Sequence, residues 1–219
     1  GELPQGARVV EAQVAKSLQI SRAPVREAVN RLLQDSLLET RTHFGASVIQ
    51  MTPQKIRYLY EVRAAIESLA IRNVTERRDE LDLEPLRMCI LEMKRRARRK
   101  DMAGLVEMEL KFHRTLCTMA ENPYVTKVSE MLDAQVRMAL TIDNSQYDNL
   151  TDVADEHEPI LDAIIGGDAD RAAALIQSHI LSSLNRIRLS SQLKSTVKAK
   201  MVNANALSSR ASLAKGLKR

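Results

Sequence analysis

From Thr52 onward, apolar residues recur at the spacing of an α-helix, and no strand-like alternation follows Met51. Aromatic residues make up only 3% of the chain, so its core must come from Leu, Ile, Val, Ala and Met. Proline, glycine and capping residues divide this region into predicted helices. Their ranges are 53–77, 83–99, 101–120, 123–142, 152–166 and 168–192. The predicted fold class is therefore mostly α, with an antiparallel helical bundle as the larger part.

The first 51 residues differ from the rest. The pattern predicts helices over 11–18 and 22–35, separated by a three-residue turn, and then strands over 37–41 and 46–51. Ser21 is a suitable N-cap for the second helix, whose first turn tolerates Pro24. Two helices followed by a hairpin are the order of a winged helix-turn-helix, which reads DNA with its second helix.

Several polar residues of this region are suited to contact DNA. Arg22 and Arg26 stand one turn apart near the start of the second predicted helix, where a guanidinium can bind guanine or phosphate. The hairpin tip would form the wing. The candidate DNA-binding residues are Ser21, Arg22, Pro24, Arg26, Arg31, Arg41, His43 and Gly45. The pattern alone also fits a small helical unit with surface arginines.

Residues 21–29, Ser-Arg-Ala-Pro-Val-Arg-Glu-Ala-Val, with Arg31 and Leu32 after them, resemble the recognition helix of the GntR family of bacterial regulators. Residues 3–11 resemble the segment before it, and residues 44–48 resemble the wing. There are two departures from the family pattern. The family normally has a further helix ahead of this segment, which we expect to be missing here, and Ser36 replaces a glycine before the wing.

Three of the four histidines, His113, His157 and His179, fall inside predicted helices of the second region. Glu109 precedes His113 by four residues, so both side chains leave the same helix face. Three imidazoles and one carboxylate from neighbouring helices can bind a divalent first-row metal. By spacing alone, these histidines also fit surface positions or hydrogen-bonded core positions.

Residues 109–113, followed by Glu121 and Asn122, resemble the hallmark of FCD, an effector domain of six or seven helices found in one GntR branch. The resemblance covers roughly residues 53–192. It implies a metal ion held by Glu109, His113, His157 and His179, with zinc preferred over nickel or manganese. Glu109 replaces the aspartate of the pattern, and Cys117, on the same face as His113, is the reserve ligand.

The FCD resemblance also implies an effector site. Arg63 matches an arginine that faces the cavity, where a guanidinium beside a metal suits a small carboxylate. The alternative is a surface ion pair between Arg63 and Glu67, one helical turn apart. Asn122 either lines the pocket or simply marks the end of a helix.

The net charge of +5 comes from the C-terminal end of the chain. From Leu193 to the end there are seven Lys and Arg and no acid, whereas residues 1–192 carry about −2. The chain has no apolar run of about 18 residues and no secretory pattern, and its two cysteines fit a reducing cytoplasm. We therefore predict a DNA-binding domain over 1–51, an effector and dimerisation domain over 52–193, a basic tail over 194–219, and no membrane association.

Together these features predict a ligand-responsive transcriptional regulator that binds a palindromic DNA operator as a homodimer. Two alternatives remain open: a metal-dependent hydrolase, and a metal-stabilised bundle without an effector. The sequence shows no separate nucleophile and no phosphate-binding glycine loop, so a non-enzyme is the prediction.

Overall fold

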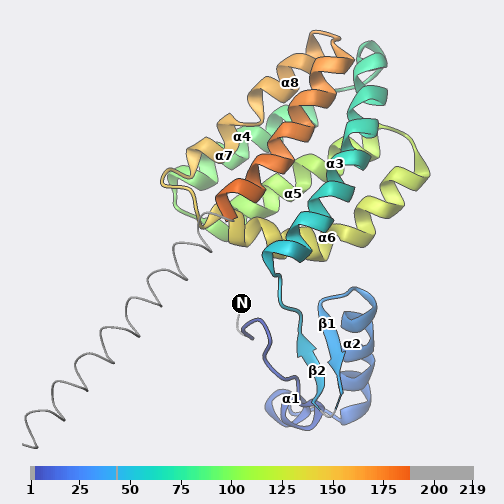
Figure 1. The fold of residues 1–219 in the computed structure, drawn as a ribbon, viewed down its shortest axis with the longest axis vertical. Coiled ribbons are helices and arrows are strands. Elements are labelled where there is room, and N and C mark those ends of the chain that lie inside the picture. Colours follow the sequence, from blue (N-terminus) through green and yellow to red (C-terminus); the bar gives the residue numbers. More distant parts are fainter. Residues whose placement is uncertain (1–2, 43, 188–219) are drawn as a thin grey trace, which may run out of the picture.

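The computed structural model describes residues 3–42 and 44–187, and within them two hydrophobic cores are separate (Figure 1). His43 and the predicted basic tail lie outside the described residues. The N-terminal part consists of α1 (Glu11–Leu18), α2 (Arg22–Gln34), β1 (Leu38–Arg41) and β2 (Gly45–Val48). The larger part contains α3 (Pro53–Glu76), η1 (Arg78–Glu80), α4 (Glu84–Arg98), α5 (Met102–Met119), α6 (Pro123–Asn144), α7 (Thr151–Asp155) and α8 (Glu158–Ile165), and a further helix over 169–187.

The N-terminal part has its elements in the predicted order. β1 and β2 form an antiparallel hairpin in which Leu38 faces Val48 and Arg41 faces Gly45. Its small core consists of Ala15, Val25, Val29 and Leu38. Ala28 and Leu32 of α2 are exposed, because α1 and β1 cover only the side that carries Val25 and Val29.

Ser36 lies in the left-handed region, with φ of 54°, directly after α2. A side chain in this conformation costs about 1–2 kcal/mol, which glycine avoids. We expect Ser36→Gly to raise the free energy of unfolding of this part by about 0.5–1 kcal/mol, measured by urea denaturation. The matched variant Ser17→Gly, inside α1, should lower it. A lower urea midpoint for Ser36→Gly would contradict this account.

The helices of the larger part begin where the sequence places capping residues. Thr52 accepts a hydrogen bond from Lys55 N, Asp101 accepts one from Gly104 N, and Asp168 accepts one from Arg171 N. These bonds satisfy backbone donors that the first turn of a helix leaves free. The predicted bounds of α3 to α6 agree with the structure to within two residues.

One predicted helix was wrong in a way that matters for function. The sequence predicted a single helix over 152–166, but the structure breaks it into α7 and α8, with His157 at the break. Pro159 explains the break, because proline has no N–H to continue the helix and fits the first turn of a new one. His157 therefore precedes α8 instead of lying within a helix.

Helix α5 lies at the centre of the bundle and packs against α3, α4 and α6. Tyr60 of α3 and the α5 residues Phe112 and Leu116 are among the fully buried side chains of this core. None of the helices in residues 3–42 and 44–187 is both long and apolar enough to span a bilayer.

Candidate metal centre

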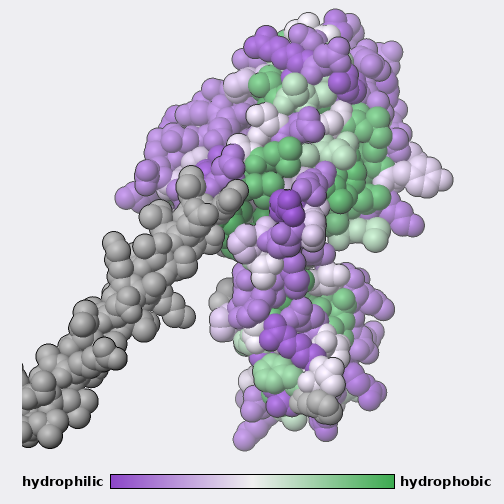
Figure 2. Space-filling model, viewed as in Figure 1, coloured by the Kyte–Doolittle hydropathy of each residue, from purple (hydrophilic) through white to green (hydrophobic). Residues whose placement is uncertain are grey.

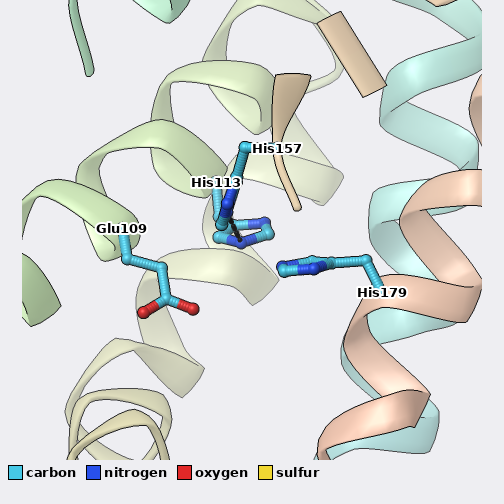
Figure 3. A group of neighbouring side chains, drawn as sticks. All are labelled: Glu109, His113, His157 and His179. Atoms are coloured by element: carbon cyan, nitrogen blue, oxygen red, sulfur yellow. Dashed lines mark hydrogen bonds between the residues drawn. The ribbon is translucent and has the colours of Figure 1, made fainter. Parts of the chain in front are cut away.

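Glu109, His113, His157 and His179 meet in the interior of the bundle (Figure 3). Glu109 and His113 come from α5, His157 from the break before α8, and His179 from the helix over 169–187. One possible ligand atom from each residue lies within 4.8 Å of the others. The exposed fraction is 3% for Glu109, 3% for His113 and 0% for His157. The structure thus brings together all four residues that the sequence predicted as metal ligands.

Each imidazole faces an outer partner with Nδ1. His113 Nδ1 lies 2.5 Å from Glu67 Oε2, and His157 Nδ1 donates to the carbonyl of Val153 at 2.7 Å. His179 Nδ1 lies 3.2 Å from Glu156 Oε2, without the alignment of a hydrogen bond. These contacts leave Nε2 of each ring for the centre of the cluster. Outer partners of this kind fix the tautomer and orientation of metal-binding histidines.

Burial and neighbouring charges lower the pKa values of His113 and His157. Burial, together with the charge of Arg63, lowers the pKa of His113 to about 4. Burial and the adjacent His179 and His113 hold the pKa of His157 well below its usual value. Burial alone would raise the pKa of Glu67, but the neighbouring His113 and Arg63 lower it to about 2. Since His113 is itself neutral near pH 7, Arg63 is the charged partner that keeps Glu67 ionised.

Glu109 is fixed from α6. Asn144 Nδ2 donates to Glu109 Oε2 at 2.8 Å, and this bond partly offsets the burial that raises the pKa of Glu109. Cys117 is also buried, yet among the described residues the cluster of possible ligands contains Glu109 and not Cys117. The glutamate that replaces the aspartate of the family pattern therefore still reaches the cluster.

The donor set fits a divalent first-row metal. Nε2 of His113 and Nε2 of His157 lie 3.3 Å apart. Two imidazole nitrogens bound to one tetrahedral zinc ion, each at about 2.1 Å, would be about 3.4 Å apart. Neutral imidazoles with a carboxylate are ligands that zinc, nickel and manganese accept.

Arg63 is buried beside this cluster. Its Nε donates to Glu67 Oε1 at 2.7 Å, and both residues are only 4% exposed. The ion pair that the sequence suggested therefore exists, but inside the protein and not on its surface. Arg63 Nη2 and the hydroxyl of Tyr60 are buried and have no hydrogen-bond partner within the described part of the chain. Arg63, Glu67 and His113 also line a small pocket between α3, α5 and α6.

Asn122 lies at the start of α6. Its side chain accepts hydrogen bonds from the backbone N–H groups of Tyr124 and Val125, so it caps α6. The N-cap position explains this role, because the first turn of a helix has free donors. Sequence reasoning missed the outer partners Asn144 and Glu156, and it named Glu67 only as a partner of Arg63 and not of His113.

Most of the predicted DNA-binding residues are exposed. Ser21, Arg22, Pro24, Arg26 and Arg31 are exposed at or along α2, and Gly45 is exposed in the hairpin. Ser21 is at the N-cap position of α2, although its side chain makes no capping bond within the described residues. Arg41 is partly engaged, since its guanidinium donates to Glu39 at 2.7 and 2.9 Å.

Comparisons with known proteins identify the relatives of this chain. Residues 58–182 match the FCD domain. A protein of Paenarthrobacter nicotinovorans named "Probable D-xylose utilization operon transcriptional repressor" is 32% identical over 84% of this chain and 80% of its own length. The gluconate operon transcriptional repressor of Bacillus subtilis is 28% identical over 81% of this chain and 74% of its own length.

Solved structures share the fold. McbR/YncC of E. coli has a TM-score of 0.72 at 19% identity, covering 87% of this chain and 91% of that one. A structure described as transcriptional regulator GntR from Rhodococcus sp. RHA1 has a TM-score of 0.70 at 21% identity, covering 85% and 89%. Because the curated relatives are named as regulators and repressors, the prediction of a non-enzyme is supported. The chain belongs to the GntR family of transcriptional regulators, in the branch that carries the FCD domain.

Proposed function

We propose that this cytoplasmic regulator binds a palindromic operator as a homodimer and responds to a small carboxylate at a metal centre in its helical part. The observation that carries the proposal is the cluster of Glu109, His113, His157 and His179, in which each imidazole turns Nδ1 outward. These four residues would hold the metal, which would supply a positive charge and open coordination positions for an anion.

The exposed side of α2 supports the DNA-binding part of the proposal. Arg22 and Arg26 are exposed there one turn apart, and the side chain of Arg22 is 72% exposed. Arg31 is also exposed, on another side of α2. The N-terminus of a helix also attracts phosphate. One such helix reads few base pairs, so two copies related by a two-fold axis are needed to read a palindrome.

An apolar face formed by α3 and α6 is the surface we assign to the homodimer. Three apolar residues of α3 recur at helical spacing and have large exposed fractions: Tyr58 at 57%, Val62 at 48% and Leu69 at 47%. On α6, Met131 is exposed by 66%. Ile66 and Leu132 line one pocket, which places the two helices side by side here. Figure 2 shows apolar surface over α3. Exposed apolar side chains gathered on one side of a protein are typical of an interface.

We expect Val62→Glu to weaken self-association by at least about 100-fold, because an unpaired charge at an apolar interface is costly and the dimer contains it twice. Sedimentation velocity over a range of concentrations measures this effect. Leu91→Glu is the matched control, since Leu91 is 53% exposed on α4, away from this face. If Val62→Glu sediments as the wild type does, α3 is not the dimer surface.

The effector part rests on the buried donors next to the metal cluster. Arg63 Nη2 and the Tyr60 hydroxyl lack partners among the described residues, and burying unpaired donors costs about 1–3 kcal/mol each. A carboxylate that accepts from these donors would remove that cost. The bidentate geometry of arginine suits this anion.

The test is a thermal-shift titration of the metal-loaded full chain with small carboxylates and with their amides. We expect at least one carboxylate to raise the melting temperature and to change the affinity for an operator selected from random DNA duplexes. Arg63→Lys should reduce the response. A large effect of the metal with no carboxylate response would instead support a metal-stabilised bundle, and metal-dependent turnover would support the hydrolase.

A further inference from the structure

Arg186 is not a candidate metal ligand, yet its guanidinium contacts three side chains close to the metal cluster. Its Nε and Nη2 donate to the two oxygens of Asp143 at 3.0 and 2.9 Å. Its Nη1 donates to Glu156 Oε1 at 3.3 Å, and its guanidinium lies 4.4 Å from the ring centre of Tyr147. Tyr147 in turn donates its hydroxyl to Glu156 Oε2 at 2.8 Å. Arg186 therefore joins the helix over 169–187 to α6 and to the end of α7.

One partner of Arg186 faces a candidate metal ligand, and another is the chain neighbour of a residue that holds a second ligand. Glu156 faces Nδ1 of His179, and Asp143 directly precedes Asn144, whose amide donates to Glu109. Asp143 is only 1% exposed, so a bidentate arginine is the partner that its buried charge needs. A change in the position of Arg186 would therefore shift the side chains that orient Glu109 and His179.

The C-terminal end of the helix over 169–187, which carries Arg186, lies next to the first residues of α3. Leu184, Asn185 and Ile187 line a groove with Pro53, Gln54 and Arg57, the first residues of α3. Only Ile49 to Thr52 separate α3 from the hairpin strand β2. Ile49 and Met51 of this connection belong to the same hydrophobic core as Ile187. The helix end that Arg186 holds is thus packed next to the junction with the DNA-binding part (Figure 1).

We propose that Arg186 is a positioning residue that connects the metal centre to this junction. A metal bound by His179 and Glu109 would fix the Glu156–Arg186–Asp143 network, and the network would fix residues 184–187 against the start of α3. This inference rests on the proposed metal site. In this proposal, Arg186 couples the metal site to the segment that connects α3 with the DNA-binding part. Measurement of this coupling is the test of the proposal.

Zinc binding and hydrogen exchange of the full chain test the proposal. Competition with a chromophoric chelator gives the zinc affinity, and exchange with and without zinc gives the protection of residues 49–60. In the wild type we expect zinc to slow exchange there. Arg186→Gln should weaken zinc binding by about 10- to 100-fold, and at saturating zinc the added protection of residues 49–60 should be lost. Arg186→Lys should give intermediate values, because lysine keeps the charge but not the bidentate geometry.

Arg171→Gln is the matched control, since Arg171 is exposed on the same helix, and it should leave both readouts unchanged. Wild-type zinc affinity, or wild-type protection of residues 49–60, in Arg186→Gln would overturn the proposal. If circular dichroism shows that Arg186→Gln has lost its helices and is unfolded, Glu156→Gln takes its place in both measurements, with the same expected results. It keeps the side-chain volume and removes the charge between Arg186 and His179. A wild type that binds no zinc, nickel or manganese would instead reject the metal site itself.

Discussion

His157→Gln is expected to remove almost all of the stabilisation that zinc gives to the chain. A metal present at about 1,000 times its Kd stabilises the folded state by about 4 kcal/mol. For a protein of this size, that corresponds to a rise of about 8–16 °C in melting temperature. His157 is fully buried and lies 3.3 Å from the ring nitrogen of His113, so its loss breaks the centre of the cluster. The measurement is the difference between the melting temperatures with and without zinc.

This difference separates metal binding from packing. His157→Gln also changes a buried contact with Val153, which shifts the melting temperature equally with and without zinc. Cys117→Ala is the control, because Cys117 is buried in the same helix but lies outside the cluster. We expect it to keep the full zinc effect. A zinc effect that survives in His157→Gln but disappears in Cys117→Ala would show that the ligand set is wrong.

The sequence predicted those parts of the fold that depend on local signals. Thr52, Asp101 and Asp168 mark helix starts because each offers a side-chain oxygen to a nearby backbone N–H. The break at His157 also had a local signal in Pro159, which the apolar periodicity of residues 152–166 outweighed. For Asn122 the sequence left two roles open, because a capping residue and a pocket residue look alike in sequence.

The candidate site was predictable only in its innermost residues. Histidines are few, and the spacing of Glu109 and His113 puts both on one helix face. The roles of Glu67, Asn144 and Glu156 as outer partners were missed because they depend on contacts between elements distant in sequence, such as Glu67 and His113, which are 46 positions apart. No periodic pattern encodes such contacts. The outer partners become visible only when the helices are packed.

The second large effect concerns DNA. We expect Arg26→Ala to weaken binding to the selected operator by about 30-fold to 10⁴-fold, because a good contact to a base contributes about 1–3 kcal/mol and a homodimer makes it twice. Arg26 is exposed on α2, one turn from Arg22, so its removal leaves the core of Val25 and Val29 intact. Fluorescence anisotropy with labelled duplexes measures the affinity.

Arg171→Ala removes the same charge from an exposed position in the larger part and should leave operator affinity unchanged. Non-specific DNA distinguishes the two possible roles of Arg26. If Arg26 reads a base, its loss lowers the affinity for the operator much more than the affinity for a random duplex. If it contacts phosphate, both affinities fall together and the dependence on salt becomes weaker. Wild-type affinity in Arg26→Ala would mean that α2 does not enter the groove, and the DNA-binding surface would then have to be sought elsewhere on the chain.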